Sequence, residues 1–85
     1  MTEKQAIRRA MWSRRWSQAK VAEKMGMKHQ SNVSEMLKEG RSVRFETFMK
    51  LMTAMDFEIT ITNMRNPDEQ YVVNGEYEDV YDEED

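Results

Sequence analysis

Residues 17–38 read SQAKVAEKMGMKHQSNVSEMLK, and apolar residues recur in this stretch at helical spacing in two short runs. Gly26 separates the two runs at a position typical of the left-handed residue that ends a helix. Ser17 is a typical N-cap, so the first run predicts a helix over Ser17–Met25. The second run predicts a helix over Gln30–Lys38. We therefore expect two short helices joined by a tight turn.

The segments on either side predict two longer helices. Thr2 and Gln5 form a capping box that begins a helix over about Glu3–Ser13. An apolar stripe predicts a further helix over about Val43–Met55. Its expected buried residues are Phe45, Phe48, Met49, Met52 and Met55. Trp12 and Trp16 are expected to cover the core partly, near the end of the first helix.

The period of the apolar pattern changes after residue 56. The alternation over Phe57–Thr62 predicts a strand with Phe57, Ile59 and Ile61 on one face. Asn66-Pro67-Asp68 indicates a turn, Tyr71–Val73 a short second strand, and Asn74-Gly75 a hairpin signal. The predicted fold class is mainly α, with four helices followed by a C-terminal strand or hairpin.

Charge divides the chain into two unlike halves. Residues 1–50 contain 12 Lys and Arg against 5 acids, whereas residues 51–85 contain only Arg65 against 11 acids. The basic half is the natural candidate for contact with a polyanion, because neutralisation of phosphates drives most non-specific DNA affinity. Residues 76–85 hold 7 acids and no base, so we expect a disordered acidic tail.

The two short helices have the layout of a helix-turn-helix. Ala22, Met25, Val33 and Leu37 are apolar residues that can seat them on a core, and Gly26 permits the turn. The outer face of the second helix is short and polar, as contact with base edges requires. Its residues are Gln30, Ser31, Asn32, Ser34 and Glu35.

The residues from Ser17 to Met27 and from Gln30 to Ser34 resemble the helix-turn-helix of the lambda-type phage repressors, the Cro/CI or XRE-like regulators. The resemblance covers about residues 3–57, and Lys28-His29 makes the turn one residue longer than the lambda-type pattern. It implies sequence-specific binding of double-stranded DNA by a small homodimeric regulator, with an inverted-repeat operator and most simply a repressor's role.

The resemblance also implies roles for single residues. Base contacts are expected from Gln30, Ser31, Asn32 and Glu35, of which Gln30 matches the recognition glutamine that bonds adenine. Phosphate contacts are expected from Gln18, Lys28, Ser34, Lys38 and Arg41. The predicted division of the chain is a DNA-binding domain over 1–56, a dimerising strand or hairpin over 57–75, and the tail over 76–85.

The strand after the fourth helix resembles that of HipB-type antitoxins, in which it pairs with its copy from a second subunit. Phe57, Ile59 and Ile61 would then form the dimer interface. This leaves two alternatives to a plain regulator. One is an antitoxin that binds both its operator and a toxin protein. The other is a protein-interaction adaptor without DNA binding, which a salt-dependent affinity for DNA would exclude.

Composition argues against several other classes of protein. The chain has no cysteine and a single histidine, His29, so a transition-metal site is not expected. The acids cluster near the C-terminus and no glycine-rich phosphate loop exists, so we expect neither catalysis nor a cofactor. No apolar run approaches the ~18 residues of a membrane span, and no signal peptide is recognisable. We expect a cytoplasmic protein without membrane contact.

Overall fold

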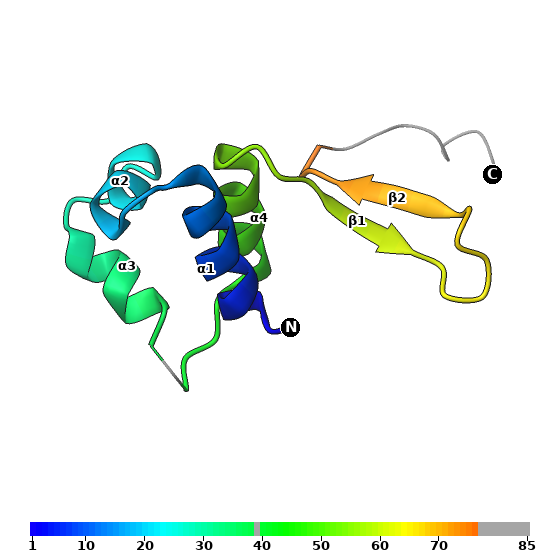
Figure 1. Cartoon of the computed structure of the whole chain (residues 1–85), viewed down its shortest axis with the longest axis horizontal. Coiled ribbons are helices and arrows are strands. Elements are labelled where there is room, and N and C mark those ends of the chain that lie inside the picture. Colours follow the sequence, from blue (N-terminus) through cyan, green and yellow to red (C-terminus); the bar gives the residue numbers. More distant parts are fainter. Residues whose placement is uncertain (39, 77–85) are drawn as a thin grey trace.

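The computed structural model describes residues 1–38 and 40–76, which form four helices and one two-stranded antiparallel sheet (Figure 1). The helices are α1 (Glu3–Arg14), α2 (Gln18–Lys24), α3 (Gln30–Met36) and α4 (Phe45–Ala54), and the strands are β1 (Ile59–Thr62) and β2 (Gln70–Val73). The described part of the chain is mainly helical. The helices form one body, and the β1–β2 hairpin extends from it on the side of α4 (Figure 1).

Side-chain caps begin the first two helices. The Thr2 hydroxyl accepts from the Gln5 backbone N–H at 3.2 Å, while the Gln5 side chain accepts from the Thr2 N–H at 3.0 Å. The Ser17 hydroxyl accepts from the Lys20 N–H at 3.1 Å. Each cap satisfies donors that have no partner within the helix. The predicted starts of α1 and α2 are therefore confirmed.

The core lies where the four helices meet. Its fully buried side chains are Ile7 of α1, Val21 of α2, Val33 of α3, and Leu51 and Met55 at the end of α4. Trp16, Met36 and Phe48 pack against this cluster from its border. Among the described residues no polar or charged side chain is buried. Apolar burial, at about 25 cal/mol per Å², is thus the main force that holds the short helices in place.

Arg14 joins the end of α4 to the end of α1. Its Nε donates to the Met55 carbonyl oxygen at 2.7 Å, and its guanidinium pairs with the Asp56 carboxylate at 3.0 Å. Asp56 adopts a left-handed backbone with φ of 67°, which turns the chain from α4 toward β1. The direction in which the hairpin leaves the helical body is set at this junction.

The hairpin loop lies at one of the two turn signals that the sequence contains. Ile59 pairs with Val73 and Ile61 with Tyr71, so the turn lies between Thr62 and Gln70 and contains the predicted Asn66-Pro67-Asp68. Backbone bonds from Asn63 to Glu69 and from Glu69 to Asn66 close this loop. The prediction of Asn74-Gly75 as the hairpin signal is wrong, because this pair follows β2 and packs beside Met49 of α4.

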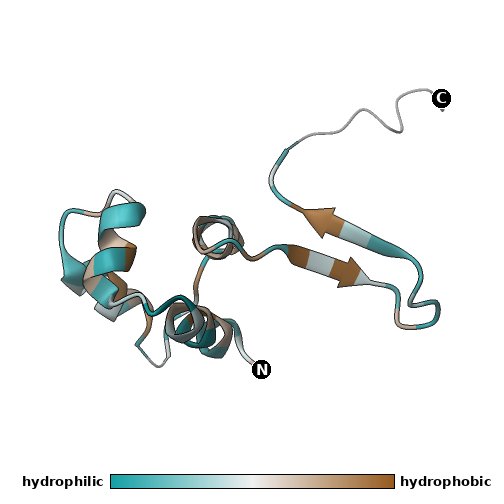
Figure 2. Ribbon diagram, turned by 45° about the horizontal axis from the view of Figure 1, so that its top comes forward, coloured by the Kyte–Doolittle hydropathy of each residue, from teal (hydrophilic) through white to brown (hydrophobic). Residues whose placement is uncertain are grey.

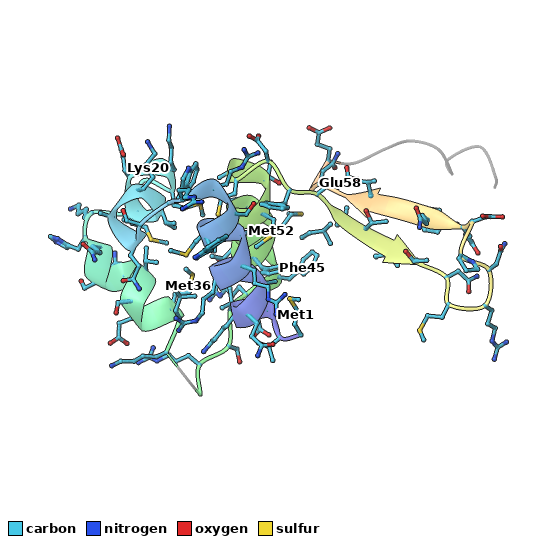
Figure 3. The ribbon with its side chains drawn as sticks, viewed as in Figure 1. Met1, Lys20, Met36, Phe45, Met52 and Glu58 are labelled. Atoms are coloured by element: carbon cyan, nitrogen blue, oxygen red, sulfur yellow. The ribbon has the colours of Figure 1, made fainter. Side chains whose placement is uncertain are left out.

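Two aromatic residues that were expected in or against the core are exposed. Phe45 begins α4, is 56% exposed, and extends toward the side of the hairpin, whereas Met52 of the same helix faces the core (Figure 3). Leu51, which the predicted stripe omitted, is buried instead. Trp12 is 73% exposed because Ile7, Ala10 and Met11 already occupy the inner face of α1. Trp16 is half-buried, as expected.

Leu51→Ala tests the position of the core. Leu51 is 1% exposed, so its truncation should lower the free energy of unfolding by roughly 2–5 kcal/mol through lost burial and the cavity left behind. Thr53→Ala, on the exposed side of the same helix, should change it by less than about 0.5 kcal/mol. Urea unfolding followed by circular dichroism measures both, and equal losses for the two variants would contradict the assigned core.

Candidate functional site

The α2–α3 connection is closed by two backbone hydrogen bonds. The Met27 N–H donates to the Ala22 carbonyl at 2.8 Å, and the Gly26 N–H donates to the Glu23 carbonyl at 3.2 Å. This is the Schellman pattern, in which a left-handed residue ends a helix, and Gly26 supplies it with φ of 72°. The turn, together with burial of Val21 and Val33 in one cluster, fixes how α3 lies against α2.

The outward face of α3 is polar and open to solvent. Gln30, Ser31, Asn32 and Ser34 are all exposed, whereas Val33 and Leu37 on the opposite side are buried. Figure 2 shows the hydrophilic colouring of the α2–α3 end of the molecule, in contrast to the apolar residues of the strands. Gln30 and Ser34 are four residues apart and therefore share one side of the helix. These short side chains offer both donors and acceptors to an external partner.

Two basic side chains of α1 hold the C-terminal end of α3. The Arg8 guanidinium donates to the Leu37 carbonyl oxygen at 3.0 Å, and the Lys4 ammonium donates to the Lys38 carbonyl oxygen. Carbonyls at a helix end have no partner within the helix, so cations are well placed there. Neither Lys4 nor Arg8 was predicted from the sequence to belong to the site. Their spacing of four residues shows that they share one side of α1, but their partners lie about thirty residues away in the chain, which the sequence pattern does not reveal.

Glu35 of α3 forms ion pairs with two cationic side chains that follow the helix. Its carboxylate pairs with the Lys38 ammonium at 3.0 Å and with the Arg41 guanidinium at 3.2 Å. The hydrogen bond from Lys38, and then the positive charges of Lys38 and Arg41, lower the pKa of Glu35 from its usual 4.5. A predicted base contact and two predicted phosphate contacts are thus joined in one ion-pair network. It borders a shallow hollow that Asn32, Arg44 and Thr47 also line.

The remaining predicted residues fall into two groups. Gln18 is the first residue of α2 and is half-buried, and Lys28 lies exposed in the turn before α3. Phe57, Ile59 and Ile61 belong to the hairpin segment, on the other side of the helical body (Figure 1). Of these three, Ile59 packs partly against the core, while Ile61 is 56% exposed.

Scans against protein-family models, curated proteins and solved structures find no match to this chain. None of the helices at residues 1–38 and 40–76 combines the length and apolar character that crossing a membrane requires. Within the same residues, His and acidic side chains do not gather in groups that could hold a metal ion. His29 occupies the N-cap position of α3, is exposed, and makes no capping hydrogen bond.

The ion-pair network predicts a measurable pH response. The Glu35 carboxyl should titrate below 4.5 in the folded protein, and Lys38→Met should raise its pKa toward that value by removing both a donor and a charge. Because the folded pKa is the lower one, the pairing stabilises the protein above the unfolded pKa and is lost as pH falls through the folded pKa. Carboxyl chemical shifts followed by NMR measure both. The same titration for the two proteins would contradict the network.

Proposed function

We propose that this protein binds double-stranded DNA, with α3 in the major groove and α2 across the sugar–phosphate backbone. The observation that carries the proposal is the exposed set of uncharged hydrogen-bonding side chains on a short helix, at Gln30, Ser31, Asn32 and Ser34. Base edges in the major groove are recognised by such groups, and the groove, about 12 Å wide, admits one helix. Cations at Lys28, Lys38 and Arg41 lie on both sides of this set in the chain and suit flanking phosphates.

The packing of α3 supports this role. A recognition helix must be held firmly by its inner face while its outer face stays accessible to DNA, because misplacement of side chains by about an ångström weakens base contacts. Val33 and Leu37 anchor the inner face, and Arg8 and Lys4 hold the C-terminal end. The polar face therefore costs little ordering entropy when it binds.

We further propose that the protein acts as a homodimer assembled through the hairpin. An isolated two-stranded hairpin is marginal in water, and this one exposes Ile61 and Tyr71 as a directly opposed pair on one face. In the described chain β2 pairs with one edge of β1 only. Pairing of the other edge with a second copy would satisfy its backbone groups, and packing of the second copy over this face would bury it together with Phe57. A two-fold axis would then suit an inverted-repeat operator with half-sites about 34–36 Å apart. This is the arrangement of a small transcriptional regulator, most simply a repressor.

The direct test of DNA binding is selection of bound duplexes from a random pool, followed by anisotropy titration of the selected sequence. We expect an inverted repeat whose affinity falls steeply with salt. Failure to enrich any sequence, together with no salt-dependent binding, would contradict the proposal and favour a protein-interaction adaptor.

Gln30→Ala should separate base reading from charge. Loss of its amide should cost about 1–3 kcal/mol on the selected site and relax selectivity at one base pair. Lys38→Ala is the matched control, since loss of a phosphate contact should weaken all sequences alike and reduce the salt slope by about one. If Gln30→Ala instead weakens every sequence equally, its base-reading role is wrong.

Ile61→Lys tests the dimer. The substitution places a charge on the exposed apolar face, whereas Thr60→Lys places it on the opposite face of the same strand. Ile61→Lys should give a monomer by light scattering and bind the operator more weakly, and Thr60→Lys should leave both unchanged. A wild-type monomer at tens of micromolar would overturn the dimer. If the wild type is monomeric and a co-purifying toxin covers the hairpin, the antitoxin is the better account.

A further inference from the structure

After Met1, the most exposed large hydrophobic side chain of the described helical body is Trp12, which is 73% accessible on α1. The Arg15 guanidinium lies over its indole ring, 5.1 Å from the ring centroid. Such stacking orients the guanidinium while leaving its N–H groups available. We call this surface the α1 patch. It consists of Trp12, Arg15 and Arg8, which lies one turn before Trp12 on the same side of α1.

The backbone at Arg15 is unusual for this residue type. Arg15 adopts the left-handed conformation, with φ of 60°, at the C-cap of α1. Side chains other than Gly, Asn and Asp rarely occupy this region because the Cβ atom crowds the following carbonyl. Glycine at this position would relieve the backbone strain, yet the chain has an arginine. Strained residues of this kind concentrate at sites of function.

The α1 patch adjoins both helices of the proposed DNA-binding site. Trp12 and Arg8 line a shallow hollow together with Gln18, the first residue of α2, and Leu37, the C-cap of α3. Arg8 also donates to the Leu37 carbonyl at 3.0 Å. A duplex that lies along α2 and α3 would therefore run next to this patch.

The stretch of chain that carries the patch has charges of one sign. Residues 4–22 contain six Lys and Arg and no acid, so this stretch of α1 and α2 has no carboxylate of its own to neutralise it. A polyanion complements the charge of such a surface better than a protein partner that is apolar or has few acidic residues. The indole also offers one N–H donor and a flat face that suits a sugar ring.

From these observations we propose that the α1 patch binds the DNA phosphodiester backbone beside the groove that α3 enters. Arg15 contacts a phosphate, and Trp12 lies against the adjoining sugar and holds Arg15 in place. This contact rests on the proposed DNA binding and extends its footprint from the α2–α3 pair onto α1. It adds affinity for all sequences alike, since the backbone carries no base information.

Intrinsic fluorescence gives a direct readout. In Trp16→Phe, Trp12 is the only tryptophan, so we expect an operator duplex to change its emission and to reduce its quenching by iodide. In Trp12→Phe, the half-buried Trp16 should respond much less. Unchanged quenching of Trp12 in a protein that binds the duplex would overturn the α1 contact and leave the proposed function intact. If no duplex binds the wild-type protein, the proposed function itself fails.

Arg15→Gly adds a test in which binding should weaken while stability is kept or raised. Removal of the left-handed arginine should keep or raise the melting temperature, whereas affinity for any duplex should fall on the order of tenfold, with a salt slope smaller by about one. Trp12→Ala should also weaken all sequences alike. Arg9→Ala, elsewhere on α1, is the control and should have the smaller effect. Equal effects of Arg9→Ala and Arg15→Gly, or unchanged binding by Arg15→Gly, would overturn the assignment.

Discussion

A helix of seven residues is not stable alone in water, and this protein presents two of them side by side. Their existence depends on burial of Val21 and Val33 against Ile7 and Leu51, which α1 and α4 contribute. Once the inner face of α3 is used in this way, its outer face is fixed in direction. The surface that we propose for DNA is therefore a consequence of how the small core is filled.

Polar contacts refine what the core determines. Lys4 and Arg8 satisfy carbonyls at the end of α3, and Arg14 holds the junction from which the hairpin leaves. Hydrogen bonds from charged side chains to carbonyls contribute modest free energy individually, but they select one arrangement of elements that apolar burial alone would leave looser. Separation of the polar α3 face from the apolar hairpin gives the molecule two surfaces with different chemistry, one rich in hydrogen-bonding groups and one apolar.

Local signals in the sequence predicted the elements well. The capping box at Thr2 and Gln5, Ser17 as N-cap and the alternation after residue 56 each depend on neighbours a few positions away. All correspond to described elements, although β1 begins at Ile59 and not at the predicted Phe57. Periodicity could not reveal that Phe45 and Trp12 are exposed, because their burial depends on which distant residues fill the core. It could not reveal the contacts of Arg8 and Arg14 either, because their partners are distant in the chain. Asn74-Gly75 misled because a turn dipeptide does not specify which strand ends pair. The predicted base and phosphate residues lie around α3 as a group, but their roles remain predictions, and the acidic segment over 77–85 lies outside the described residues.

The most direct test of the central claim is an NMR titration of the ¹⁵N-labelled protein with a short DNA duplex at low salt. We expect the amide and side-chain signals of α3, above all those of Gln30, Asn32 and Ser34, to shift. The signals of Gln18 and of the turn at Lys28 should shift with them, while those of the hairpin loop stay in place. Absence of any shift at millimolar duplex, or shifts confined to the hairpin, would contradict the central claim.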